Sequence, residues 1–351
     1  MRKLSAMLLL LMVLMSCNEN SKEIVVEIDL DGAVNTIKYS NFVKSLEYIN
    51  LELPDSLPLK GVKRLYIDKD KVFVADSHQG EILIFDKNTG RALARIDNFG
   101  EGPEELKIMA AFCLDTYHDL VCIFDKGDMK IKMYSYEGKY VSSYSSDMFF
   151  IDMVKLDENS LTYFYPIYAE GEQYNGIWTR DYLEERVNYI DSLVTPNNRF
   201  HYFPMIYNYN GDNAFYYDRY KDQMYIVTAD AVKNIYKFKL SHKLPEVVMG
   251  MKNLTPDKLD GYSIVHEFVC SENYLLLSTQ TFEKSNISKK NLKWFLLDRK
   301  NGEKMIANNL ENDLDSIVIS NNSLYFLDEY TWVRVDDTND KSITMQIMHL
   351  K

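Results

Sequence analysis

Short runs of β-branched and aromatic residues, separated by Asp, Asn and Gly, recur along most of the chain. A run at 72–76 is joined to one at 82–85 by a polar segment, and runs at 121–125 and 131–134 are joined in the same way. Such short runs are typical of strands, and the residues between them close turns between antiparallel strands. The pattern predicts an all-β chain built from hairpins.

The first two hairpins are copies of one another. Asp76 and Asp125 lie 49 residues apart, as do Phe85 and Tyr134, and each copy continues into a glycine turn. A repeat of about 40 to 50 residues with four short strands is typical of a β-propeller blade, which buries its faces only against neighbouring blades.

Fainter copies follow along the rest of the chain. Runs that end at Asp230 and Asp328 are 98 residues apart, which is twice the first interval, and runs at 161–165 and 274–278 fill the remaining positions. Six repeats centred near 76, 125, 165, 230, 278 and 328 predict a six-bladed β-propeller. The segment 168–219 departs from the repeat, and we interpret it as the outer strands of the third blade with an insertion.

Two N-terminal segments, 24–28 and 42–53, have strand character but no blade of their own. We expect both to complete the sixth blade beside the last strand, at 343–347. A propeller closed by N-terminal strands has no exposed sheet edge between its first and last blades.

The first seventeen residues have the pattern of a bacterial lipoprotein signal. Arg2 and Lys3 precede an apolar run at 4–13, and Ser16 and Cys17 follow. The apolar run is shorter than the roughly 20 residues of a spanning helix, so we expect cleavage before Cys17 and lipidation of that residue. The predicted organisation is a signal peptide at 1–16, a lipidated Cys17 with a polar tether at 17–23, and the propeller at 24–351.

The composition limits the classes of partner. The formal net charge is −12, and removal of the signal peptide takes away two basic residues, so a nucleic acid partner is not expected. The 26 Tyr and 17 Phe residues favour strands. Cys113 and Cys122 could form one disulfide or remain buried thiols, and Cys270 would then be left over.

Residues 72–86, with the sequence VFVADSHQGEILIFD, resemble a blade of the NHL-repeat type. Residues 99–105 are similar to a Gly-x-Gly-Pro-Gly-Glu turn, with Glu104 in place of the usual Gly. With the lipoprotein signal, these features make the chain similar to the six-bladed β-propeller lipoproteins of Bacteroidetes. The resemblance implies a propeller in the cell envelope, and it implies no activity.

No known catalytic or metal-binding motif is present in the sequence. The six histidines show no metal-ligand spacing, Ser40 occupies the position where a calcium loop starting at Asp29 needs Glu, and Gly-x-Ser-x-Gly is absent. We therefore predict no metal and no cofactor, the alternative being a metal held by His78 together with residues of other blades.

One region is rich in aromatic residues interspersed with Asn and Asp. Such side chains can stack on sugar rings and bond their hydroxyl groups, but they can equally pack between blades. The candidate ligand-binding residues are Tyr202, Tyr207, Tyr209, Tyr216, Tyr217 and Tyr220.

These features together predict a lipoprotein of the cell envelope, at the outer membrane, held to the membrane through its lipid anchor. We expect it to be a non-catalytic binding or scaffold protein for envelope proteins or glycans. The alternative is a hydrolase or lyase that acts on glycan or peptide substrates in the central funnel of the propeller.

Overall fold

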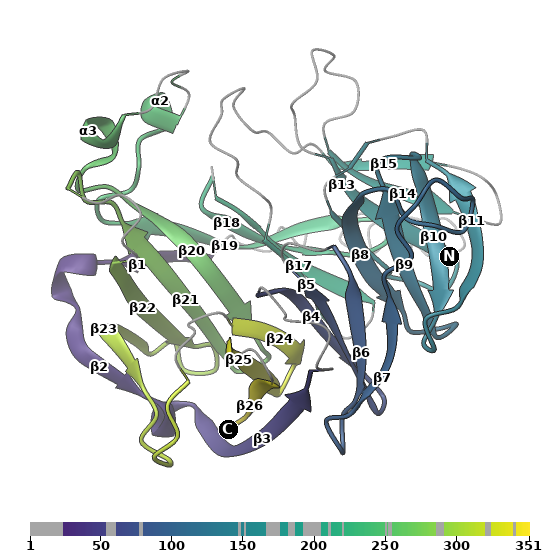
Figure 1. Cartoon of the computed structure of the whole chain (residues 1–351). Helices are drawn as coiled ribbons and strands as arrows, with labels where there is room; N and C mark the ends of the chain where they lie inside the picture. The colour runs from purple at the N-terminus through teal and green to yellow at the C-terminus, as the bar shows by residue number, and fades with distance from the viewer. Residues whose placement is uncertain are drawn as a thin grey trace, which may run out of the picture.

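The computed structural model is an all-β protein whose sheets are arranged as a six-bladed β-propeller (Figure 1). Its strands belong to six separate sheets of four or five strands. The structure describes residues 24–53, 61–76, 80–146, 149–150, 152–165, 176–181, 187–191, 205–209, 212–219, 221–249, 251, 255–285, 291–319, 324–339 and 342–351.

The first three blades each consist of four consecutive antiparallel strands. Blade one contains β4 (Val62–Asp68), β5 (Lys71–Asp76), β6 (Ile82–Asp86) and β7 (Ala92–Ile96). Blade two contains β8 (Met109–Asp115), β9 (Leu120–Asp125), β10 (Lys130–Ser135) and β11 (Tyr140–Ser145). Blade three contains β12 (Asp152–Val154), β13 (Ser160–Tyr165), β14 (Gly176–Asp181) and β15 (Val187–Asp191).

The last three blades combine consecutive strands with strands from the N-terminus. Blade four contains β16 (Met205–Tyr209), β17 (Asn213–Asp218), β18 (Gln223–Val227) and β19 (Val232–Leu240), with β1 (Ile24–Ile28) beside β19. Blade five contains β20 (Ser263–Cys270), β21 (Tyr274–Thr281), β22 (Asn291–Asp298) and β23 (Lys304–Glu311), with β2 (Val34–Lys38) beside β23. Blade six contains β24 (Leu324–Asp328), β25 (Thr331–Asn339), β26 (Ser342–Leu350) and β3 (Val43–Glu52).

The N-terminal segment therefore contributes to three blades. β3 pairs antiparallel with β26, whereas β1 and β2 pair parallel with β19 and β23. The expectation that residues 24–28 join the sixth blade is wrong, because these residues add a fifth strand to blade four. The short helical turns η1 (Leu30–Gly32) and η2 (Tyr39–Asn41) carry the chain from each blade to the next.

The sequence repeat corresponds to the second strand of a blade only in part. Asp76 and Asp125 both end second strands, β5 and β9. Asp230, in contrast, follows the third strand of blade four, and Asp328 ends the first strand of blade six. The second strand of blade four ends at Asp218, so loops of unequal length, rather than a fixed interval, separate equivalent positions.

The segment 168–219 also differs from its interpretation. It holds β14 and β15, the outer strands of blade three, and in addition β16 and β17, the first two strands of blade four. Where an insertion was expected, the described part of this segment supplies half of another blade.

Asp125 shows why an aspartate is useful at the end of a second strand. It is fully buried, and it accepts hydrogen bonds from the backbone N–H groups of Lys107 (2.8 Å), Ile108 (2.9 Å) and Gly127 (3.0 Å), and from Lys132 Nζ (2.8 Å). Burial disfavours the carboxylate, but these hydrogen bonds outweigh that effect and lower the pKa of Asp125. The connection from blade one is thereby fixed to blade two.

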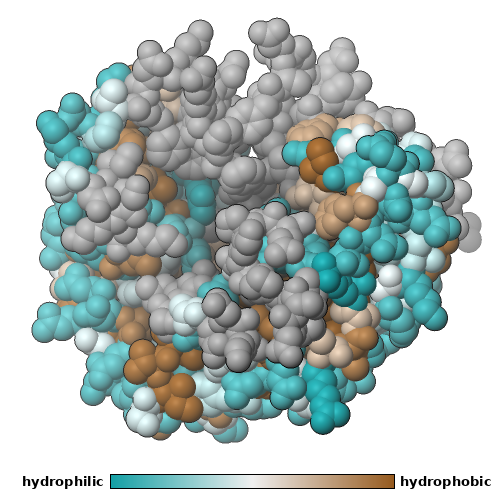
Figure 2. Space-filling model, in the orientation of Figure 1, coloured by the Kyte–Doolittle hydropathy of each residue, from teal (hydrophilic) through white to brown (hydrophobic). Residues whose placement is uncertain are grey.

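Apolar clusters fill the spaces between neighbouring blades, and between β19 and β20 two short helices, α2 (Glu246–Met249) and α3 (Pro256–Leu259), add a smaller cluster. On the face drawn in Figure 2, polar side chains predominate and apolar ones form smaller groups between them. Within the described ranges, no helix is long and apolar enough to cross a membrane.

The turn of blade one contacts β3 closely. Glu52 N donates to Gly90 O (2.8 Å), and Gly90 has a φ of +73°. A Cβ atom at this position would lie 1.8 Å from the carbonyl oxygen of Asn50, so only glycine fits here. Blade one thus holds the outermost strand of blade six by its backbone.

The contribution of β3 can be tested at Leu51, a fully buried residue in an apolar cluster that contains residues of blades one and six. We expect Leu51→Ala to lower the free energy of unfolding by about 2–5 kcal/mol, measured by urea denaturation, because it removes buried methyl groups and leaves a cavity. Glu52→Ala, at the exposed neighbouring position, is the matched control and is expected to change the free energy by less than about 0.5 kcal/mol. Equal effects of the two substitutions would show that β3 does not pack as described.

Candidate functional site

The candidate tyrosines that the structure describes fully lie in the core. Tyr216 is 4% exposed and stacks on Tyr225 at a centroid distance of 5.7 Å. Tyr217 is fully buried beside Phe238 and Phe268. These two rings pack between blades, which is the alternative interpretation given above, and they present no face to a ligand.

Tyr217 also takes part in a polar contact within the core. Its hydroxyl donates to Asp222 Oδ1 (3.1 Å), while Lys243 Nζ lies 2.8 Å from Asp222 Oδ2. Burial raises the pKa of Asp222 to about 6, although Lys243 acts in the opposite direction. Tyr217 thus has a structural role in blade four.

The other predicted site residues lie outside the described part of the structure. Cys17, Tyr202 and Tyr220 fall in segments that are not described, and β16 contains Tyr207 and Tyr209 without a description of their side chains. In the described ranges, no group of three or more His, Cys, Asp or Glu side chains could hold a metal ion.

An ion pair joins the first strands of two blades. Arg64 on β4 and Asp152 on β12, the first strands of blades one and three, form two hydrogen bonds of 2.5 Å each. Arg64 also donates to the hydroxyl of Tyr66 (3.3 Å). This bidentate pair joins two blades that are not neighbours in the order of the sheets along the chain.

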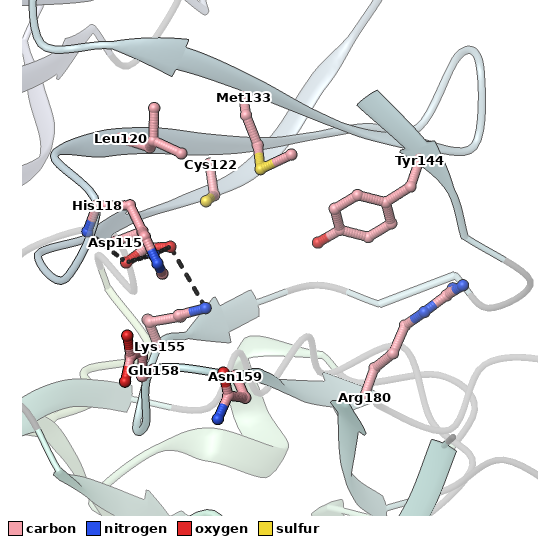
Figure 3. Close-up of a pocket in the computed structure, with 10 residues that line it drawn as sticks. All are labelled: Asp115, His118, Leu120, Cys122, Met133, Tyr144, Lys155, Glu158, Asn159 and Arg180. Atoms are coloured by element: carbon pink, nitrogen blue, oxygen red, sulfur yellow. Dashed lines mark hydrogen bonds and ion pairs between the residues drawn. The ribbon is translucent and has the colours of Figure 1, made fainter. Parts of the chain in front are cut away.

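A cavity of about 390 Å³ lies between blades two and three (Figure 3). This volume is within the range of small-molecule sites, roughly 300–1,000 Å³. Side chains from all four strands of blade two, from β14 of blade three and from the turns after β8 and β12 surround it. The lining residues are Asp115, His118, Leu120, Cys122, Met133, Tyr144, Lys155, Glu158, Asn159 and Arg180.

One end of this cavity is built on the carboxylate of Asp115. Asp115 ends β8, and its Oδ1 accepts the backbone N–H groups of Tyr117 (3.1 Å) and His118 (3.2 Å), which closes the turn to β9. Its Oδ2 lies 3.0 Å from His118 Nδ1 and 3.3 Å from Lys155 Nζ. Lys155 directly follows β12, so this ion pair crosses from blade two to blade three.

The ion pair is removed from solvent. The side chains of Asp115 and Lys155 are only 5% and 3% exposed, whereas the His118 ring is about half exposed. A buried pair of opposite charges is costly to separate, because either partner alone would remain without compensation in an environment of low dielectric constant. The pair therefore holds the two walls of the cavity at a fixed distance.

The opposite end of the cavity carries the guanidinium group of Arg180. Arg180, on β14, donates from Nη1 to the backbone oxygen of Ser145 (2.9 Å), and its guanidinium lies 5.4 Å from the ring centroid of Tyr144. Figure 3 shows Arg180 and Tyr144 at this end, away from Asp115 and Lys155. A guanidinium on an aromatic face can still bond a carboxylate or phosphate in its own plane.

The wall between the two ends is apolar. Leu120 and Cys122 are two positions apart on β9, so their side chains point to the same face of the sheet. Met133 lies opposite Cys122 on β10. On the other side, the turn held by Asp157 places Glu158 and Asn159 at the rim. The arrangement suits a ligand with an apolar body and an anionic group near Arg180.

Sequence reasoning did not find this site. Asp115, Lys155 and Arg180 are far apart in the chain, and each belongs to a strand end or turn of ordinary composition. The only local signal is the Asp115 turn, which occurs in many hairpins without a ligand.

A second cavity, of about 480 Å³, lies between blades five and six. Arg334, on β25, is 6% exposed in its wall and donates to the Tyr39 hydroxyl and, from Nη2, to Ile319 O (3.3 Å). Burial raises the pKa of Tyr39, although the charge of Arg334 opposes this shift. Because Tyr39 also donates to Gln346 Oε1 (3.2 Å), this polar network ties η2 to blade six.

The Asp115–Lys155 pair can be tested by a double-mutant cycle. We expect Lys155→Met to lower the free energy of unfolding in urea by about 3 kcal/mol, because it leaves a buried carboxylate without its cation. The double variant Asp115→Asn/Lys155→Met should lose less than the sum of the two single variants, by on the order of 1–3 kcal/mol. Additive losses would show that the two side chains do not interact.

Comparisons with known proteins agree with the fold. A Bacteroides fragilis protein named as an exported protein has a similar structure, with a TM-score of 0.71, 14% sequence identity, and coverage of 93% of this chain and 99% of that one. A member of the DUF4221 family from Bacteroides vulgatus has a TM-score of 0.62 with 8% identity, and covers 88% of this chain and 98% of that one. At such identities the likeness concerns the fold alone.

The search of curated proteins gives no match. A family model does match, over residues 25–341, which reaches into all six blades and ends just before β26. The chain therefore belongs to the family described as Domain of unknown function (DUF4934).

Proposed function

We propose that this protein is a lipid-anchored, non-catalytic binding protein of the cell envelope, and that the cavity between blades two and three is its ligand site. The observation that carries the proposal is the cavity itself, with a fixed ion pair at one end and Arg180 at the other. The lipoprotein signal pattern and the likeness to a Bacteroides fragilis protein named as an exported protein support the location.

The chemistry of the cavity indicates the kind of ligand. The apolar side chains of Leu120, Cys122 and Met133 favour an aliphatic or aromatic body, and Arg180 favours a carboxylate or phosphate. A cavity of about 390 Å³ has the volume of a small-molecule site, so it would hold only the end of a longer envelope peptide or glycan. A peptide ends in a carboxylate and an acidic glycan ends in a charged sugar, and the experiment below distinguishes the two.

The proposed membrane anchoring can be tested at Cys17. We expect the wild-type chain to partition into the membrane fraction and to carry acyl chains at Cys17 in mass spectrometry, because a lipidated cysteine holds the protein at the bilayer. Cys17→Ser should release the protein into the soluble fraction, whereas Ser16→Ala, which keeps a small residue before the cysteine, should leave it bound. A membrane-bound and unacylated Cys17→Ser variant would contradict lipid anchoring.

The ligand can be sought by thermal shift with the detergent-extracted protein against two panels, acidic envelope oligosaccharides and acidic apolar peptides. A ligand present at 100 times its Kd should stabilise the protein by about 2.7 kcal/mol, which raises Tm by several degrees. Arg180→Gln should weaken binding at least about tenfold, because it removes the charge that pairs with the anion.

Arg91→Gln, an exposed arginine of blade one, is the matched control and should bind as the wild type does. A shift from one panel identifies the class of ligand. A shift that Arg180→Gln leaves unchanged would place binding elsewhere, and turnover of any panel member would overturn the non-catalytic proposal.

A further inference from the structure

Two of the cysteines face one another across the first hairpin of blade two. Cys113 on β8 and Cys122 on β9 are direct partners in the antiparallel register, between the pairs Phe112–Ile123 and Leu114–Val121. Side chains of directly opposed residues emerge on the same face of a sheet. The register therefore brings the two thiols together without any movement of the backbone.

Both thiols lie in the apolar cluster between blades two and three. Cys113 is fully buried and Cys122 is 3% exposed, and each is part of the cluster that includes Phe124, Ile131 and Leu161. Burial raises the pKa of the Cys113 thiol, and a hydrogen bond with Cys122 acts in the same direction. The two thiols thus lie next to one another in the apolar interior.

The backbone spacing suits a covalent bond between them. Directly opposed residues of antiparallel strands have Cα atoms about 4.5 or 5.5 Å apart, depending on the type of pair. Disulfides join Cα atoms that are about 4.4–6.8 Å apart. Cys270, in contrast, lies in blade five and is buried in a different cluster, next to Ser271.

We propose that Cys113 and Cys122 form a cross-strand disulfide in the exported protein, as part of the wall of the ligand cavity. The two thiols lose two protons and two electrons as the S–S bond forms, and a disulfide of an oxidising protein or small molecule accepts them and is reduced to two thiols. Because the thiols are buried after folding, this exchange takes place before β8 and β9 close on blade three.

The bond would act on the cavity directly. Cys122 lines the cavity, and Asp115 and His118 belong to the short turn that joins the two cysteine-bearing strands. A disulfide across this hairpin restricts the turn, and with it the carboxylate that binds Lys155. It would thus fix the blade-two wall of the cavity independently of the packing around it.

The proposal rests on the proposed export, and the experiment separates the two. The full-length lipoprotein is extracted from cells under acid, denatured, and alkylated without a reductant, and its peptides are identified by mass spectrometry. We expect Cys270 to be alkylated and the peptides of Cys113 and Cys122 to be linked, with a mass about 2 Da below that of the two thiols. Cys270 is an internal control, because it is equally buried.

Alkylation of all three cysteines, or a bond to Cys270, would overturn the proposal for the cell. In parallel, the purified protein is reduced, denatured and refolded in a glutathione redox buffer. A bond formed there and absent from cells would support the geometry and contradict export to an oxidising compartment. Its absence from both samples would refute the geometry and leave the proposed export unaffected.

The effect of the disulfide on thermal stability is measured with cysteine variants. Reduction should lower the Tm of the wild type and of Cys270→Ala by several degrees, and it should leave the Tm of Cys113→Ala/Cys122→Ala unchanged. A fall in the Tm of the double variant would contradict the assignment of the effect to this pair.

Discussion

The pairing of the N-terminal segment with three successive blades is the constraint on which the rest of the structure depends. β3 completes the sheet that contains the C-terminal strands, and β1 and β2 add parallel strands to blades four and five. Partners about 300 residues apart must meet before these sheets are complete. Since long-range pairing is slow to form, the last blades become complete only after most of the chain has been ordered.

The repeat could be predicted from the sequence where local geometry determines it. Asp76 and Asp125 end equivalent strands and are both buried, and the Asp125 carboxylate bonds both the turn and the connection from the preceding blade. Asp230 and Asp328 follow similar apolar runs but lie in other strands, since the pattern of one strand does not reveal its place in the blade. For the same reason, the strand character of residues 24–28 did not reveal their partner, β19.

The candidate site was harder to predict, and the reason is physical. A tyrosine that packs between blades and one that stacks on a sugar have the same sequence pattern, and Tyr216 and Tyr217 belong to the first kind. The residues of the cavity come from two sheets and meet only because neighbouring blades pack face to face. The spacing of Asp115, Lys155 and Arg180 along the sequence does not indicate that blades two and three bring them together.

The position of the cavity has a mechanical consequence. Its two walls belong to separate sheets, and among the described residues side-chain contacts such as Asp115–Lys155 and Arg180 on the Ser145 carbonyl hold them together. A molecule that touches both walls adds to the work needed to pull blade two away from blade three. A ligand bound in the cavity would thus stiffen the interface between blades two and three and leave the other five interfaces between blades unchanged.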